Sequence, residues 1–142
     1  MSEHAAGPDV MLALARSRFL DAFALAEEAV AARLRHMHLP VHAMLAQNIQ
    51  ALKKCPANPR YSKDCKAKVD QALGSLGVIQ PIRCDVVHGP LQLVISEGET
   101  VACFANPQRS NEWARQASLI SVQQFRELTA QLHKVARNIA AD

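Results

Sequence analysis

Apolar residues recur at steps of three and four over the first part of the chain, and alanines fill many of the positions between them. This period places apolar side chains along one side of an α-helix, and alanine has the highest helix propensity. We therefore expect one long helix over residues 9–37, which begins after Pro8. Its apolar side carries Leu12, Phe19, Phe23, Ala26, Val30, Leu34 and Met37.

Two further helices are expected before the pattern changes. The pair Leu39 and Pro40 breaks the first helix, and the helical spacing resumes over residues 41–53. The third helix begins near Ser62, whose hydroxyl suits the N-cap position. Its apolar stripe comprises Cys65, Val69, Ala72, Leu76 and Ile79, and the same phase continues through Ile82 to Val86.

Pro81 falls inside this third pattern. A proline in a helix interior costs about 3 kcal/mol and usually kinks or restarts the helix. We therefore expect a kink near Pro81, followed by a short turn that carries residues 83–88. Gly89 and Pro90 then form a stop signal.

The spacing is different after residue 90. LQLVI and TVACF, residues 91–95 and 100–104, are short and rich in β-formers, and Glu97 and Gly98 lie between them. This pattern predicts a β-hairpin. Residues 107–120 are expected to form a loop with a helical turn around Trp113. A last helix follows from a capping box of Ser121 and Gln124, with an apolar side of Val122, Phe125, Leu128, Leu132, Val135 and Ile139.

These elements predict a mainly α fold, a bundle of about four main helices with a small β-hairpin inserted before the last helix. The hairpin is too small to be stable alone and must pack on the bundle or on a partner. The length of 142 residues suits a single domain over residues 1–142.

The net charge of +3 conceals a local asymmetry. Segment 53–68 carries six basic residues and one acid, a charge of +5, and the rest of the chain carries −2. Such a segment can attract phosphates, but charge alone favours an ordinary solvated loop with the first turn of a helix. The candidate RNA-binding residues are Lys53, Lys54, Arg60 and Lys63.

Other features of the sequence bear on location and cofactors. No apolar run approaches the ~18–20 residues that span a bilayer, and the N-terminus has no basic signal-peptide region. We therefore expect a cytoplasmic protein without a membrane segment, whose four cysteines are reduced. His36, His38 and His42 form a cluster, but Pro40 breaks helical pairing and no acid or cysteine lies among them. No metal site and no cofactor is predicted.

An arginine followed four to six residues later by a histidine occurs four times in the chain. Three copies have simple structural explanations at helix ends or on a solvated helix face; they are Arg33 to His38, Arg35 to His42 and Arg126 to His133. The fourth copy, Arg83 to His88, contains Asp85 and precedes a predicted hairpin. This context makes it the candidate for a functional motif.

The string IRCDVVHG, residues 82–89, resembles the Arg–polar–x–x–x–His motif of the HEPN family (higher eukaryotes and prokaryotes nucleotide-binding domains). It is similar to members that have an R-N-D-hydrophobic-V-H-G string after a bundle helix and before short strands. The order of the predicted elements also fits. The order of the predicted elements matches over most of the chain. Specific residues match only at positions 83–89.

This resemblance implies a function. Many HEPN proteins are metal-independent RNases that act as homodimers, with the arginine and histidine at the two-fold cleft. Several are toxins with a nucleotidyltransferase-like antitoxin, whereas others are non-catalytic modules that bind nucleotide, RNA or protein. Carried over, Arg83 would bind the scissile phosphate and His88 would exchange a proton with the ribose 2′-hydroxyl. A helical interaction protein without a nucleic-acid role is a third alternative.

The chemistry of these residue types agrees with that implication. Histidine titrates near neutral pH, and the guanidinium fork of arginine suits a phosphate. Asp85 lies one helical turn before His88 and is predicted to orient its imidazole. Five helical steps turn about 140°, so Arg83 and His88 converge only at a kink, a helix end or a dimer cleft. Cys84 departs from the polar residue usual in the motif, which favours the non-catalytic alternative.

Overall fold

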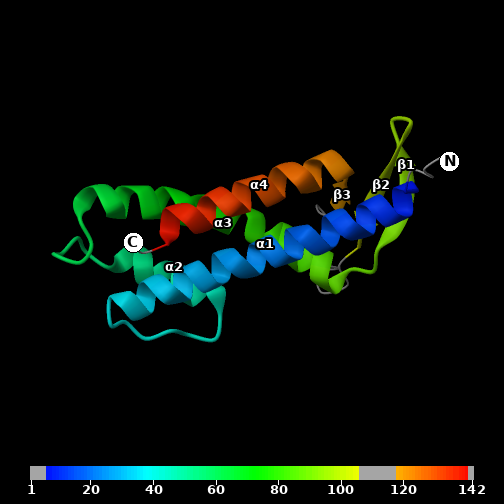
Figure 1. Ribbon diagram of the computed structural model, residues 1–142. Helices are drawn as coiled ribbons and strands as arrows, with labels where there is room; N and C mark the ends of the chain where they lie inside the picture. The colour runs from blue at the N-terminus through cyan, green and yellow to red at the C-terminus, as the bar shows by residue number, and fades with distance from the viewer. Residues whose placement is uncertain (1–5, 106–117, 141–142) are drawn as a thin grey trace.

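Four helices and a small sheet make up the described part of the chain, residues 6–105 and 118–140, in a computed structural model (Figure 1). The protein is mainly α, and its sheet is antiparallel and lies before the last helix, which confirms the predicted fold class. The elements are α1 (Pro8–His36), α2 (Leu45–Lys54), α3 (Lys63–His88), β1 (Gln92–Ser96), β2 (Glu99–Phe104), β3 (Ser118–Ile120) and α4 (Val122–Ile139).

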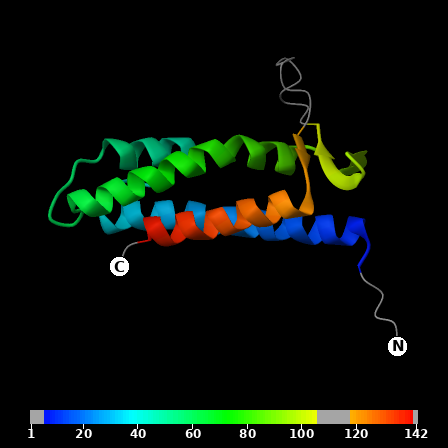
Figure 2. The ribbon, with the colours of Figure 1, turned by 90° about the horizontal axis from the view of Figure 1, so that it is seen from above.

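The first and last helices form the most extensive contact of the bundle. α1 and α4 lie side by side and run in the same direction, and α3 packs against α4 (Figures 1 and 2). α2 packs against α1 and α3. The sheet lies at the end of the bundle where α1 begins and α3 ends.

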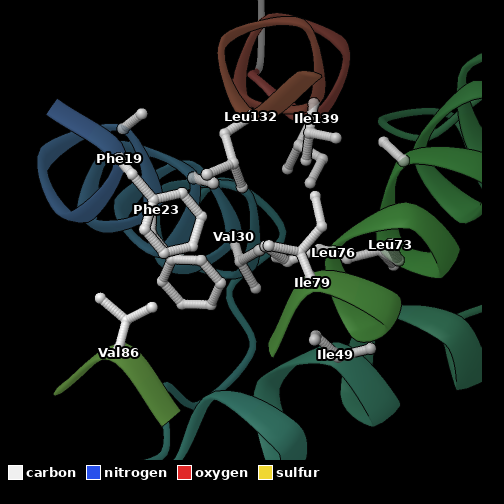
Figure 3. Packing of buried hydrophobic residues seen from close by; sticks show 14 of the residues in the cluster. Phe19, Phe23, Val30, Ile49, Leu73, Leu76, Ile79, Val86, Leu132 and Ile139 are labelled. Carbon is white, nitrogen blue, oxygen red and sulfur yellow. The ribbon is translucent and has the colours of Figure 1, made fainter. Parts of the chain in front are cut away.

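Apolar side chains from all four helices meet in one core (Figure 3). Phe19 of α1 packs on Phe125 of α4 with ring centroids 5.7 Å apart, and Phe104 of β2 meets Phe125 edge-on at 6.1 Å. These aromatic contacts attach the sheet to the bundle. The predicted hairpin is thus confirmed in both its existence and its packing on the helices.

Side chains cap the helices as their sequences predict. Ser62 accepts a hydrogen bond from the backbone N–H of Cys65 at the start of α3. Ser121 and Gln124 form the full capping box of α4, with bonds of 3.1 and 2.9 Å. At the other end of α4, buried Arg33 donates from Nε to the carbonyl of Ile139 at 2.9 Å. This bond satisfies a carbonyl that the helix itself leaves without a partner.

The separate short turn predicted for residues 83–88 after Pro81 is wrong, because α3 continues through Pro81 to His88. Ile79 and Val86 are both buried in the core, so packing holds the helix on either side of the proline. Residues 83–88 therefore form the last turns of a long helix.

A third strand was not predicted. Residues 118–120 form β3, which pairs antiparallel with β2 and places Ile120 opposite Ala102. The predicted loop is therefore wrong for these three residues, because a strand this short shows no alternation. Residues 107–117, with the helical turn predicted around Trp113, lie outside the described residues.

No helix within residues 6–105 and 118–140 is long and apolar enough to cross a membrane. The four cysteines, which all lie in this part, are free thiols.

Candidate functional site

Arg83 lies on α3 and faces α1. Its Nη2 is 3.9 Å from Oε1 of Glu27, and its guanidinium lies 5.5 Å from the ring centroid of Phe23. The Arg83 and Glu27 side chains are 37% and 38% exposed. The ring holds the guanidinium from one side, while the long ion pair leaves its donors accessible to a ligand.

His88 is the last residue of α3 and is exposed. Because the helix is continuous, Arg83 and His88 are separated by about 140° of rotation and a rise of about 7.5 Å. The two side chains therefore leave α3 in different directions. One chain alone does not present them as a pair to one phosphate.

Asp85 points elsewhere. Its side chain is buried, at 3% exposure, and its Oδ2 accepts a hydrogen bond of 2.7 Å from the Ser118 hydroxyl. Ser118 belongs to β3. Among the described residues, no hydrogen bond joins Asp85 to His88. The structure thus brings Asp85 together with the sheet, and the imidazole of His88 stays at the surface.

The predicted RNA-binding residues gather at the opposite end of the molecule. Lys53 and Lys54 end α2, Arg60 lies in the following loop, and Lys63 begins α3. All four are exposed, and none forms an ion pair within the described residues. Twenty helical steps separate Lys63 from Arg83, about 30 Å along α3. The start of α3 and its end lie at opposite ends of the molecule (Figure 1).

Arg60, the basic residue of the loop between α2 and α3, lies in a tight turn. The backbones of Asn58 and Tyr61 exchange two hydrogen bonds of 2.9 and 2.8 Å. The side chain of Asn58 also accepts from the backbone N–H of Arg60 at 2.9 Å. Arg60 therefore projects from a defined turn, and Lys63 follows in the first turn of α3.

Glu27 is a further residue of this region and is not part of the string at residues 82–89. Glu27 pairs with Arg83, and it also borders a hollow of about 300 Å³ between α1 and the segment before α2. Asn48 fixes that segment, since its side chain accepts from His42 N at 2.7 Å and donates to His42 O at 3.0 Å. The only local signal for Glu27 is its place beside the apolar stripe of α1.

Within the described residues, no three His, Cys, Asp or Glu side chains are grouped to hold a metal ion. The cluster of His36, His38 and His42 begins at the last residue of α1 and is exposed.

Comparisons with known proteins found no relative of this chain. No family model matches it, and no significant match was found among curated proteins or solved structures. The resemblance to HEPN proteins thus rests on the string at residues 83–89 and on the order of the elements.

Proposed function

We propose that the chain is a HEPN-like, metal-independent endoribonuclease whose active site forms where two copies meet. The observation that carries the proposal is the accessibility of the pair: Arg83 is held by Phe23 and Glu27 with its donors free for a ligand, and His88 is exposed at the same end of α3. As a toxin, such an enzyme would be paired with an antitoxin protein.

The proposed reaction is transesterification of RNA. His88 removes the proton from the ribose 2′-hydroxyl, and the 2′-oxygen attacks the adjacent phosphorus. The bond to the 5′-oxygen breaks, that oxygen takes a proton, and a 2′,3′-cyclic phosphate remains. Arg83 binds the phosphate and stabilises the charge that develops on its oxygens.

A second copy is a requirement of this mechanism. Arg83 and His88 diverge on one helix, so a site needs Arg83 of one copy beside His88 of the other. Val87, one turn after Arg83 on the same helix face, is 40% exposed, and Ala24, next to Phe23, is also exposed. These two exposed apolar side chains, on the helices that carry Arg83 and its ring contact Phe23, support a homodimer interface there.

The remaining predicted site residues have supporting roles in this proposal. Asp85, buried and bonded to Ser118, fixes the end of α3 and so positions His88. The basic residues Lys53, Lys54, Arg60 and Lys63 bind the RNA backbone at a distance from the cleavage point.

The test is cleavage of total RNA in the presence of a chelator. His88→Ala and Arg83→Ala should each lower the rate at least ~100-fold, as the loss of a general base or a phosphate ligand does. His133→Ala, an exposed histidine of α4, is the matched control and should cut like the wild type. Absence of cleavage by the wild-type protein would overturn the proposal.

Mixing the two inactive variants tests the shared cleft. A mixed dimer has one site with an intact Arg83 and an intact His88 if the two residues come from different copies. Partial return of activity on mixing is expected. No return, with mixed dimers shown to form, would place both residues of a site in one chain.

A second candidate function is a non-catalytic RNA- or nucleotide-binding module. The separation of about 30 Å between Lys63 and Arg83 favours it, because the basic residues are then free to bind RNA without reaching the pair. Cys84, in place of a polar residue, points the same way. Salt-dependent RNA binding without cleavage, weakened by Lys53→Ala and Lys63→Ala, would identify this alternative.

A further inference from the structure

The groove between α1 and α4 contains a hollow that neither proposed function uses. Its volume is about 120 Å³, well above the ~10–15 Å³ that is needed to hold one water molecule. It lies near the first turns of both helices. Its lining residues are Met11, Leu14, Ala15, Arg18, Arg126 and Thr129.

Every polar side chain in this lining can donate a hydrogen bond, and none is an acid. Arg18 and Arg126 are exposed and form no ion pair or hydrogen bond within the described residues. The Thr129 hydroxyl oxygen is buried and has no hydrogen-bond partner among the described residues. A buried hydroxyl without a partner is unfavourable, so the hollow offers one unsatisfied hydroxyl beside two guanidiniums.

The charge in the hollow has the same sign throughout. Both charged residues of the lining are arginines, Arg18 and Arg126, and no carboxylate among the lining residues neutralises them. An oxyanion bound between them would neutralise the charge and accept from both forks. The apolar side chains of Met11, Leu14 and Ala15 form the rest of the wall.

A larger hollow adjoins the first. Its volume is about 470 Å³, and it shares Met11 and Arg126 with the smaller one. It extends to the turn of the hairpin, where Glu99 and Thr100 provide a carboxylate and a hydroxyl. A ligand whose anionic group lies at the arginines can therefore extend its body toward acceptors at the hairpin.

We infer that this pair of hollows binds a small phosphate monoester, with its phosphate between Arg18 and Arg126 and its body directed toward Glu99. A phosphate monoester carries a charge of about −1.5 to −2 at neutral pH, which matches two guanidiniums better than a carboxylate does. Its three terminal oxygens also match the two forks and the Thr129 hydroxyl. A body with hydroxyl or amino groups suits Glu99.

Isothermal titration calorimetry at low salt tests this inference. The probes are inorganic phosphate, adenosine 5′-monophosphate, adenosine and acetate. The monophosphate should bind most tightly, inorganic phosphate more weakly, and adenosine and acetate weakest. Arg18→Gln and Arg126→Gln should each weaken binding of the monophosphate about tenfold, and Thr129→Val, which keeps the volume, by less.

Arg137→Gln is the matched control. Arg137 lies on α4, is exposed, and lines neither hollow. The affinity of the Arg137→Gln variant for the monophosphate should therefore equal that of the wild type. The inference is overturned if neither phosphate nor the monophosphate binds at millimolar concentration. It is also overturned if adenosine or acetate binds as tightly as the monophosphate, or if Arg18→Gln and Arg126→Gln bind like Arg137→Gln.

Discussion

Ser118 donates a hydrogen bond to Asp85, with 2.7 Å between Oγ and Oδ2, and this bond joins β3 to the last turns of α3. The acid of the IRCDVVHG string is therefore part of the fold. Since Asp85 is buried, the bond fixes the end of the helix that presents His88. The sheet and the candidate site are thereby coupled.

Removing this donor should lower stability measurably. Ser118→Ala is expected to lower the free energy of unfolding by about 1.5–3 kcal/mol, because a hydrogen bond to a charged group contributes that much. The measurement is urea unfolding, with a lower midpoint and an unchanged slope. Ser96→Ala on β1, whose hydroxyl makes no hydrogen bond within the described residues, is the control. Equal losses in both variants would contradict the assigned role.

The sequence predicts local features well because their signals are local. Apolar spacing located α1, α3 and α4, and the hydroxyls of Ser62 and Ser121 located two helix starts. The third strand was missed because three residues carry no period. The bond between Ser118 and Asp85 spans 33 positions, and no local pattern encodes it.

The same reasoning explains what the sequence says about the candidate site. The motif names Arg83 and His88, since both lie within one short string. It does not name Glu27, because the contact of Glu27 with Arg83 arises only when α1 and α3 pack together. Helix continuity through Pro81 is likewise decided by tertiary burial of Ile79 and Val86.

Glu27 should regulate the availability of Arg83. Glu27→Gln keeps the side-chain shape and removes a carboxylate that competes with phosphate for the guanidinium. An exposed pair contributes about 0.2–1 kcal/mol, so RNA affinity should rise by up to about fivefold, with little change in stability. Filter-binding measurements at fixed salt give the affinity.

Glu28→Gln serves as the control for this variant. Glu28 pairs with Arg35 on an exposed part of α1, away from Arg83. Its substitution removes the same charge from the chain, so any general electrostatic gain appears in both variants. A larger gain for Glu27→Gln is expected, and equal gains would show that the ion pair with Arg83 does not matter.

Two glycines of α3 should be replaceable with a gain in stability. Gly74 and Gly77 lie inside the helix, and a Cβ added at either position meets no atom within 4 Å. Alanine is favoured over glycine in a helix interior by about 0.5–1 kcal/mol. Gly74→Ala and Gly77→Ala should each raise the free energy of unfolding by roughly that amount, measured by urea unfolding.

Gly89 provides the contrasting case. A Cβ there would lie 2.8 Å from the Asp85 carbonyl oxygen and 3.2 Å from Cβ of Phe104. Gly89→Ala should therefore destabilise the protein by about 1–3 kcal/mol, as overpacking does. Stabilisation by Gly89→Ala would show that the end of α3 is less closely packed against β2 than the structure has it.

Tyr61 should make stability fall at alkaline pH. Burial, followed by the negative charge of Asp70, raises the pKa of Tyr61 to about 12. An unfolded tyrosine has a pKa of about 10, so the contribution of Tyr61 to stability is complete below pH ~10 and is lost as pH rises toward 12. Tyr61→Phe should abolish this part of the loss, measured by urea unfolding at several alkaline pH values.

The titration itself is directly observable, because Tyr61 is the only tyrosine of the chain. Tyrosinate absorbance should appear near pH 12 in the folded protein and near pH 10 in urea. The Tyr61 hydroxyl is buried and has no hydrogen-bond partner in the part of the chain that the structure describes, so Tyr61→Phe should be at least as stable as the wild type at neutral pH. Ionisation of the folded protein near pH 10 would contradict the burial of this ring, and marked destabilisation by Tyr61→Phe would reveal a partner for its hydroxyl.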